Sequence, residues 1–384
     1  MSDLELWRQA GLYDPDDPGS HERLALLRYL SDRGASIDQM VEAHAQGNLP
    51  AVASDLVVRK NEVVRASEVA ARSGIALDRV LRVLLAAGIP AEPDTEVPAK
   101  AIDLMAAFEQ GSALMGDEAI LAFTRLLGAA AIQIAEAAVA LFYSELGPGT
   151  EREGRDELTR AQVAETATMA FTAVPDVLAQ MVFDQFERAL RRAVAVRGWG
   201  QESGMGSSEG DALNSGANAE YVALGFVDLV GSTAWAQGLS LRDQSLALAR
   251  FESAAWSSAV LSGGRVVKTI GDEVFFAAPT ADVACRIGID TIRAAAEDEV
   301  LPAARGVVGL GYATPREGDY FGPLVNLLSR MVKIGDPNDL IVTEVAAKEL
   351  SPRDWSLEAL EPIELRGIDG PVRTFHVERI SETT

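Results

Sequence analysis

The apolar residues of this 384-residue chain repeat with two different periods, and a polar segment separates the two patterns. Over residues 1–197 they recur every three or four positions, which is the period of amphipathic helices. Over residues 219–384 short apolar runs typical of strands alternate with helical stretches. Residues 198–218 are rich in Gly, Ser, Asn and Glu, a composition typical of flexible linkers. We therefore predict an N-terminal domain, a linker and a C-terminal domain over these three ranges.

The two domains are expected to differ in fold class. The first should be all-α, with helices over 22–33, 66–87, 118–146 and 160–197. The second should alternate strands and helices over 221–227, 241–260, 265–270, 273–278, 281–295 and 306–312, with a further helix over 323–334. The resulting order, β-α-β-β-α-β, is the ferredoxin-like split βαβ arrangement of an α+β domain.

Charge and metal-ligand composition exclude several classes of protein. There are 57 acidic and 34 basic residues, a formal charge of −23, so the chain lacks a broad basic surface for nucleic-acid backbones. One cysteine, Cys285, allows neither an intrachain disulfide nor a thiolate zinc site. The three histidines, His21, His44 and His376, are too scattered for the spacing of zinc ligands.

One apolar run, residues 126–143, is nearly long enough to span a membrane. Gln133 and Glu136 lie at its centre, where a carboxylate is costly in lipid. We therefore expect a buried helix of a soluble domain and no membrane span. Residues 1–5 are acidic where a secretory signal is basic and then apolar, so we expect a cytoplasmic location.

Two aspartates lie at the ends of predicted strands. Asp228 closes the apolar run 225–227 and precedes a Gly-Ser-Thr turn, 231–233, that leads into a helix. Asp272 lies beside Gly271 at the tip of the predicted hairpin. Carboxylates at neighbouring strand ends form the hard-oxygen site that Mg²⁺ uses together with substrate phosphates. The alternative is a helix cap for the first aspartate and a simple turn position for the second.

Three segments that stand in order along the chain contain these aspartates and four other polar positions. They are Phe226–Thr233 (FVDLVGST), Lys268–Glu273 (KTIGDE) and Gly318–Arg330 (GDYFGPLVNLLSR). Together they resemble the catalytic domain of class III nucleotidyl cyclases, and the resemblance covers about residues 220–380. Because six motif positions match in order, the resemblance is far more specific than a single turn or cap.

The resemblance implies roles for two pairs of residues. Asp228 and Asp272 match the aspartates that bridge two Mg²⁺ or Mn²⁺ ions per site, which activate the ribose 3′-hydroxyl and neutralise the leaving pyrophosphate. Lys268 and Asp319 match the pair that recognises the purine. A lysine donor for adenine N1 and an aspartate acceptor for the 6-amino group complement adenine and reject guanine. The implied reaction is therefore the conversion of ATP to cyclic AMP and pyrophosphate.

Asn326 and Arg330 match the transition-state pair of these cyclases, and at four residues apart they share one helix face. The implied roles are ribose orientation for Asn326 and charge stabilisation at the α-phosphate for Arg330, against the alternative of a surface polar pair. Arg366 falls where cyclases often place a cation for the triphosphate, although a solvated surface arginine fits as well. Leu327–Ser329 depart from the small residues usual between the pair, and we expect their bulk to alter packing at a subunit interface.

The resemblance also implies self-association. In class III cyclases the metal-binding pair and the purine-binding and transition-state residues of one site come from different subunits. This chain carries each set once, so a symmetric homodimer would build two equivalent sites.

The N-terminal half contains no motif for chemistry. Residues 66–90 combine two helical stretches with a turn at Gly74, which fits a DNA-binding helix-turn-helix. An αα-hairpin inside a helical bundle is favoured because the acidic charge opposes DNA, so no DNA binding is expected.

This half also resembles the autoinhibitory regulatory domain of a subgroup of actinobacterial cyclases that respond to acidic pH. At least one such domain carries a fatty acid, so the resemblance implies a fatty acid as a candidate ligand around residues 129–141, where packed side chains are the alternative. A pH response would depend on Glu136, if it is buried, or on His21 and His44, for which solvated positions are favoured.

Two alternatives to an active enzyme belong to other functional classes. One is a catalytically silent ATP-binding sensor that signals through the helical half. The other is a helix-turn-helix regulator with a cyclase-like dimerisation domain. Silent domains of this kind typically lose one of the six motif positions, and all six are present here, which favours the enzyme.

Overall fold

The computed structural model describes residues 2–58, 62–146, 156–202, 219–368 and 370–380. Contacts divide the chain into two units, Met1–Gln185 and Phe186–Thr384. The division falls within helix α10 (Val174–Glu202), which continues past residue 198, where the linker was predicted to begin. Glycine weakens a helix but does not prevent it. The prediction therefore ended the helix too early, because it took Gly198 and Gly200 as the start of a linker. The rest of the predicted linker lies outside the described residues.

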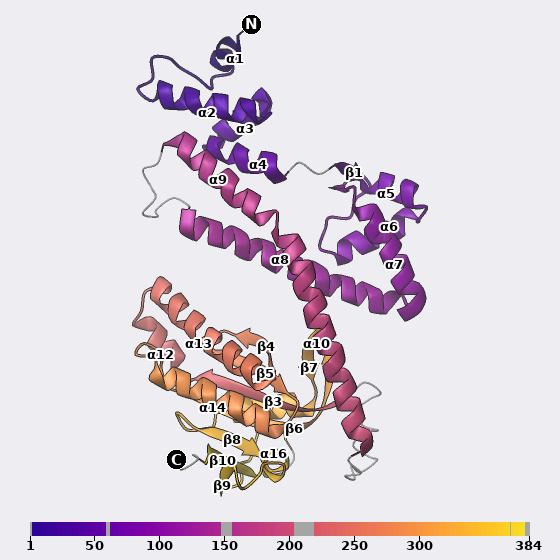
Figure 1. The fold of residues 1–384 in the computed structure, drawn as a ribbon, viewed down its shortest axis with the longest axis vertical. Helices are drawn as coiled ribbons and strands as arrows, with labels where there is room; N and C mark the ends of the chain where they lie inside the picture. The colour runs from indigo at the N-terminus through magenta and orange to yellow at the C-terminus, as the bar shows by residue number, and fades with distance from the viewer. Residues whose placement is uncertain (1, 59–61, 147–155, 203–218, 369, 381–384) are drawn as a thin grey trace. The chain divides into compact units, whose positions relative to one another are not determined.

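The second unit is built on one mixed sheet with the strand order β4-β5-β3-β6-β8-β10-β9, and β7 pairs with β6 (Figure 1). All neighbouring strands are antiparallel except β6 and β8. The strands are β3 Glu220–Leu229, β4 Arg265–Ile270, β5 Glu273–Ala278, β6 Ala304–Arg316, β7 Asp319–Phe321, β8 Leu340–Thr343, β9 Trp355–Ala359 and β10 Thr374–Arg379. The partial order β4-β5-β3-β6 confirms the predicted ferredoxin-like arrangement.

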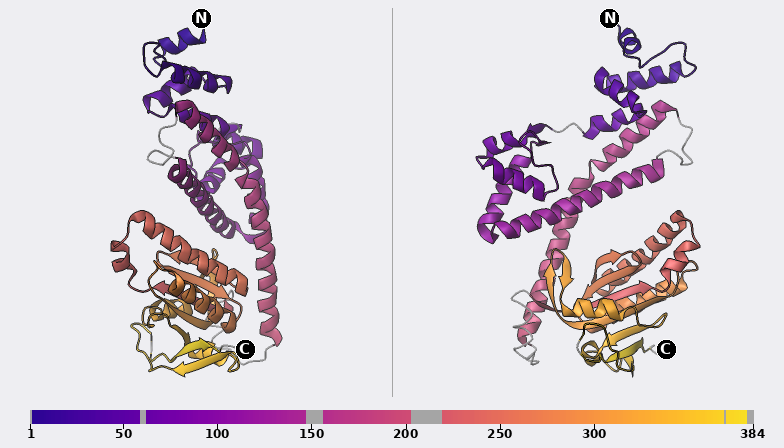
Figure 2. Two further views of the ribbon diagram at one scale, coloured as in Figure 1. Left: turned by 60° about the vertical axis from the view of Figure 1, so that its left-hand side comes forward. Right: turned by 180° about the vertical axis from the view of Figure 1, so that it is seen from behind.

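Helices cover both faces of this sheet. They are α12 Ser232–Gln237, α13 Leu241–Ser262, α14 Ala281–Glu297, α15 Pro323–Met331 and α16 Glu344–Lys348. Helices α13 and α14 lie along one face (Figure 2), where Phe251 and Cys285 pack against Val227 of β3. Helix α15 lies on the other face, where Leu328 joins a second core that contains Phe226. Successive side chains of β3 thus enter opposite cores, as strand alternation requires.

The close approach of α15 to the sheet depends on Gly309 of β6. A Cβ atom at this position would lie 2.7 Å from a methyl group of Leu328 and 3.0 Å from one of Leu324. These two leucines therefore mark the side of α15 that faces the sheet. Strands β4 and β5 have the predicted bounds, whereas β6 is longer than 306–312 and α15 ends at Met331, before the predicted 334.

The first unit is mainly helical and contains two separate cores. Its elements are α1 Asp3–Gln9, α2 Ser20–Asp32, α3 Ile37–Ala45, a 3₁₀ turn Leu49–Ala51, α4 Val52–Val58, β1 Val63–Arg65, α5 Ala66–Ser73, α6 Leu77–Ala86, β2 Glu96–Pro98, α7 Ala101–Met115, α8 Asp117–Leu146 and α9 Glu157–Phe171, followed by α10. One core joins α1–α4 to α9, and the other joins α5–α7 to the start of α8.

Two local features of this unit differ from the helical pattern in the sequence. Strands β1 and β2 form a short antiparallel ladder, in which Val64 pairs with Val97. The helix predicted over 160–197 is divided between α9 and α10 at residues 172–173, just before Pro175. Pro175 is the second residue of α10, and proline is favoured in the first turn of a helix, where its missing N–H leaves no bond unmade, so it suits the start of a new helix here.

The expectation that residues 126–143 form a buried helix is wrong. Ile120, Thr124 and Gly128 form a buried seam on α8, but beyond Gly128 no residue of this helix that the structure describes is fully buried. Glu136 is exposed, so it lacks the burial that the predicted pH response required. None of residues 129–141 is fully buried, so they do not line the apolar interior that was expected as a candidate fatty-acid site. By length and composition alone, Asp117–Phe142 and Glu157–Arg192 would each suffice to span a membrane.

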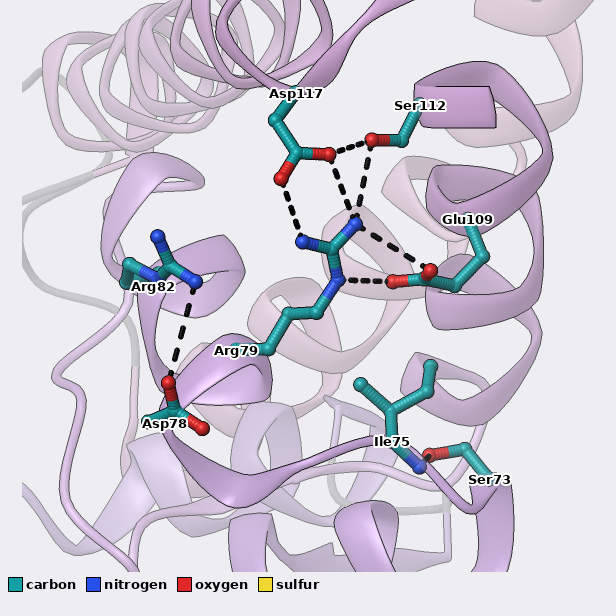
Figure 3. A network of polar contacts seen from close by, with 8 residues as sticks. All are labelled: Ser73, Ile75, Asp78, Arg79, Arg82, Glu109, Ser112 and Asp117. Atoms are coloured by element: carbon teal, nitrogen blue, oxygen red, sulfur yellow. Dashed lines mark hydrogen bonds and ion pairs between the residues drawn. The ribbon is translucent and has the colours of Figure 1, made fainter. Parts of the chain in front are cut away.

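A network of polar contacts holds the start of α8 against its neighbours (Figure 3). Arg79 of α6 donates to Asp117 through Nη1 at 2.7 Å and Nη2 at 2.9 Å, and it also bonds Glu109 and Ser112 of α7. These bonds to Arg79 lower the pKa of Asp117 and raise the pKa of the guanidinium. The network fixes three helices, α6, α7 and α8, relative to one another.

Candidate active site

Three charged side chains form a row on the sheet face that α15 covers. Asp228 of β3 is paired in register with Glu273 of β5 on one side and with Arg305 of β6 on the other. Residues directly opposite each other in antiparallel strands project from the same face of the sheet. The row therefore runs from carboxylate to carboxylate to guanidinium across three adjacent strands.

Asp228 is almost fully enclosed in this row, with 6% of its surface exposed. Its Oδ2 atom accepts hydrogen bonds from Arg305 Nε at 3.2 Å and Nη2 at 3.0 Å. Within the described part of the chain, its Oδ1 atom accepts no hydrogen bond from any side chain. One carboxylate oxygen is thus held by the protein and the other is available to a ligand.

Asp272 lies beside the same strand end. It follows Gly271, whose φ of 65° allows the tight β4–β5 turn, and its carbonyl accepts a hydrogen bond from Leu229 N at 3.2 Å. Its side chain is half-buried. The turn is therefore tied to the residue that follows Asp228, and this brings the two predicted metal-binding aspartates to one edge of the site.

Glu273 and Arg305 belong to this site although the sequence motifs did not single them out. Burial and then the neighbouring charge of Asp228 raise the pKa of the Glu273 carboxyl, while Lys333 lowers it. The signal for Glu273 was a charged residue at the head of an otherwise apolar strand. Arg305 gave no such signal, because only the register of β3 with β6 places it next to Asp228.

The carboxylate oxygens at this site fit a divalent cation whose coordination shell is completed by oxygen atoms of the substrate. Within the described residues no three His, Cys, Asp or Glu side chains converge as a metal cage. Mg²⁺ is commonly held by one or two carboxylates together with phosphate oxygens and water, so two aspartates are sufficient. The open Oδ1 atom of Asp228 and the carboxylate of Asp272 are ligands of the type that Mg²⁺ and Mn²⁺ prefer.

The structure brings the two predicted purine-binding residues together. Lys268 of β4 and Asp319 of β7, which are 51 residues apart, form an ion pair. The second oxygen of Asp319 accepts a hydrogen bond from Tyr320 N at 2.8 Å. Arg265 holds the same hairpin, because its Nη1 donates to Gly318 O at 3.2 Å and its guanidinium lies 5.2 Å from the Tyr320 ring centre. Both side chains of this ion pair remain partly exposed.

Asn326 and Arg330 lie on the exposed side of α15. Leu324 and Leu328 mark the side of the helix that faces the sheet, and a residue two positions from either lies on roughly the opposite side. Arg330 donates to the main-chain carbonyl of Arg366, whose own side chain is exposed. The pair therefore points away from the sheet face that holds Asp228.

The bulky residues between Asn326 and Arg330 have an internal role. Leu328 is fully buried and Leu327 is half-buried, and both pack in the core beneath α15. The expectation that this bulk alters a subunit interface is not supported for Leu328, because its side chain fills the domain's own core opposite Gly309.

The histidines and the cysteine lie outside this site. His21 and His44 are exposed, and His44 Nδ1 lies 3.2 Å from Arg23 Nη1. His376 lies between two carboxylates, with Nδ1 3.6 Å from Asp339 and Nε2 3.3 Å from Glu378. Burial raises the pKa of the Cys285 thiol, which makes it an inert core residue.

Comparison with known families covers both units. Residues 10–193 match the family model of the adenylate cyclase regulatory domain, and residues 265–379 match that of the adenylate and guanylate cyclase catalytic domain. The second match begins after Asp228, so it covers Asp272 and the other predicted site residues but not the first aspartate.

Three relatives are similar to this chain over most of its length. An uncharacterised protein of Mycobacterium tuberculosis is 28% identical over 98% of this chain and 94% of its own. An adenylate cyclase of Glutamicibacter nicotianae is 27% identical over 82% of this chain and 78% of its own. A pH-sensitive adenylate cyclase of Mycobacterium tuberculosis is 27% identical over 93% of this chain and 88% of its own.

Proposed function

Because the chain belongs to the class III adenylyl cyclases with an N-terminal regulatory domain, we propose that it converts ATP to 3′,5′-cyclic AMP and pyrophosphate at sites shared between two copies of the chain. The observation that carries this proposal is the ion pair between Lys268 and Asp319, which lie on neighbouring hairpins. The sheet that contains Lys268 also carries the two aspartates near its strand ends. Relatives named as adenylate cyclases support the same reaction.

ATP is the proposed substrate because the paired side chains complement adenine. Lys268 would donate to N1 and Asp319 would accept from the 6-amino group, and each would exchange its present partner for the base. Guanine carries a proton at N1 and a carbonyl at C6, so both contacts would be lost with GTP. A site built to hydrogen-bond one base leaves unpaired polar groups with the other, which makes rejection strong.

Asp228 and Asp272 would hold Mg²⁺ or Mn²⁺, two ions per site. When bound, these ions would activate the ribose 3′-hydroxyl and neutralise the charge of the leaving pyrophosphate. Asn326 would orient the ribose, and Arg330 would stabilise the negative charge that develops at the α-phosphate. Arg366 is a candidate contact for the triphosphate, and its exposed side chain leaves it accessible.

The orientation of α15 supports a homodimer. Asn326 and Arg330 face away from the sheet that carries Asp228, so one chain does not direct both sets of residues at one substrate. A two-fold axis would place the exposed pair of each chain opposite the aspartates of the other. Two equivalent sites would result.

We expect Asp319→Ala to lower kcat/KM for MnATP by at least about ten-fold and to narrow the preference for ATP over GTP, because the acceptor for the 6-amino group is lost. Initial rates with MnATP and MnGTP, followed by chromatography of the cyclic products, measure both effects. Glu317→Asn is the matched control, since it removes a carboxylate from the same hairpin and asparagine tolerates the φ of 55° found there. An unchanged ATP-to-GTP ratio in Asp319→Ala would contradict the assignment.

A catalytically silent ATP sensor makes the opposite prediction for the wild-type chain. It would bind ATP in a calorimeter and form no cyclic AMP under the same conditions. The presence of all six motif positions favours turnover. A helix-turn-helix regulator is disfavoured by α6, where Arg79 is held by Asp117 and Glu109, and Arg82 lies 4.0 Å from Asp78.

The helical unit is proposed to restrain the catalytic unit, with acidic pH or a fatty acid as candidate signals. Support comes from the regulatory-domain match over residues 10–193 and from the relative named as pH-sensitive. A chain that begins at about residue 210 should be at least about five-fold more active than the full chain at neutral pH, the size of a typical coupling between domains. The same truncated chain with Asp272→Ala controls for background activity, and equal activity of the full and truncated chains would remove the inhibitory role.

A further inference from the structure

Arg305 makes more polar contacts at the candidate metal centre than any predicted site residue. Its Nε and Nη2 atoms both donate to Asp228 Oδ2, and its Nη1 atom donates to Lys333 O at 2.9 Å and Gly335 O at 3.4 Å. All three nitrogens of the guanidinium are therefore engaged. The side chain is 19% exposed and its Asp228 partner 9%, so the pair is largely shielded from water.

This geometry fixes which oxygen of Asp228 a cation can use. Because both guanidinium bonds converge on Oδ2, the carboxylate is held in one orientation and Oδ1 is presented to the site. Mg²⁺ demands near-ideal octahedral geometry, so the direction of a ligand oxygen matters as much as its presence. Partners that orient a metal ligand in this way commonly decide metal affinity.

The charges of the row formed by Glu273, Asp228 and Arg305 also call for a cation at the position of Arg305. Asp228 has Glu273 beside it in register on β5, and both carboxylates are buried. Arg305 on β6 is the cation in register on the other side of Asp228, and Lys333 lies near Glu273. A guanidinium at this position offsets the repulsion between the two neighbouring carboxylates, and its two bonds to Oδ2 keep the Asp228 carboxylate in one orientation.

We propose that Arg305 is a positioning residue of the metal centre, which holds Asp228 by one oxygen and ties it to the turn after α15. The inference rests on the proposed function, since it assumes that Asp228 is a metal ligand. It adds a residue that the sequence motifs omit. The rival role, in which the guanidinium competes with the cation for Asp228, predicts tighter metal binding when Arg305 is changed.

The test is a titration of the full-length protein with Mn²⁺, followed by electron paramagnetic resonance, in the presence of 3′-deoxy-ATP. This analogue lacks the attacking hydroxyl, so binding is measured without turnover. Arg305→Lys keeps the positive charge but offers one nitrogen for contacts that now use three, and Arg305→Gln removes the charge. Arg293→Gln is the control, because Arg293 forms an exposed ion pair with Asp290 at 3.5 Å on α14.

We expect Arg305→Lys to weaken Mn²⁺ binding by about ten-fold or more, with Arg305→Gln weaker still and Arg293→Gln unchanged. Thermal melting should show one cooperative transition for Arg305→Lys, which keeps the test valid if Arg305→Gln does not fold. Mn²⁺ binding by Arg305→Lys that equals or exceeds that of the wild type would overturn the proposal.

The proposed function is tested separately, in the same protein preparation, by measuring the formation of cyclic AMP from MnATP. A wild-type chain that turns over while Arg305→Lys binds Mn²⁺ normally defeats the inference alone. A wild-type chain that forms no cyclic AMP, yet loses Mn²⁺ affinity with Arg305→Lys, defeats the proposed reaction and leaves the role of Arg305 in metal binding supported.

Discussion

Asp272→Ala is expected to reduce cyclic AMP formation by at least about a thousand-fold, because the loss of a metal ligand removes several kcal/mol of transition-state stabilisation. The fold should survive. Asp272 lies in a turn, its side chain is half-buried, and the bond that ties the turn to β3 uses its main-chain carbonyl, which alanine retains. Asp228 is a poorer choice for this test, since its removal would leave the buried Arg305 without its carboxylate.

The measurement is the initial rate of cyclic AMP formation with MnATP, beside a melting curve of each variant. Asp290→Ala is the matched control, because it also removes a partly exposed carboxylate from this unit and should leave the rate unchanged. Near-normal turnover by a folded Asp272→Ala chain would refute the assignment of the metal ligands.

Arg330→Ala is expected to lower kcat by about a hundred-fold or more, while KM for ATP changes much less. The reason is that a charge which stabilises the transition state alone affects kcat and leaves ground-state binding largely intact. The variant should fold, since Arg330 lies on the exposed side of α15 and the leucines that fix this helix are untouched.

Steady-state kinetics with MnATP separate the two parameters for this variant. Arg353→Ala provides the control, because Arg353 is an exposed arginine in the turn before β9, away from the motifs. A rise in KM with kcat preserved would show that Arg330 binds the substrate in the ground state and the transition state equally well. This result would contradict its assignment as a transition-state residue.

Much of the catalytic fold could be predicted from local sequence. Strands β4 and β5 have the predicted bounds because Gly271 and Asp272 interrupt two apolar runs with an unambiguous turn. The six motif residues could be named because three contiguous segments resemble the motifs of class III cyclases, and such a resemblance is visible in sequence alone. Local signals suffice where a residue's neighbours in sequence determine its setting.

Features that depend on distant partners could not be predicted. Arg305 and Asp228 are 77 residues apart in sequence, and they are in contact only because β3 and β6 pair in one particular register. No local sequence pattern marks that pairing. Helix α8 was predicted wrongly because its apolar composition does not say which of its sides pack against other helices, and among its described residues only Ile120, Thr124 and Gly128 are fully buried. The β1–β2 ladder likewise joins segments that are separated by two helices.

The central claim is that each site combines residues of two chains, and mixing two inactive variants tests it most directly. Asp272→Ala lacks a metal ligand and Arg330→Ala lacks the transition-state cation, so each variant alone should be inactive. In a dimer of one chain of each kind, one site collects both defects and the other is intact.

Equal amounts of the two variants, unfolded together and refolded or co-expressed, should recover about a quarter of the wild-type activity, since half of the dimers are mixed and each of these has one intact site. Wild-type chains mixed with either variant calibrate the exchange of subunits. Activity of the mixture that does not exceed the sum of the two variants, with exchange demonstrated, would contradict a site shared between chains.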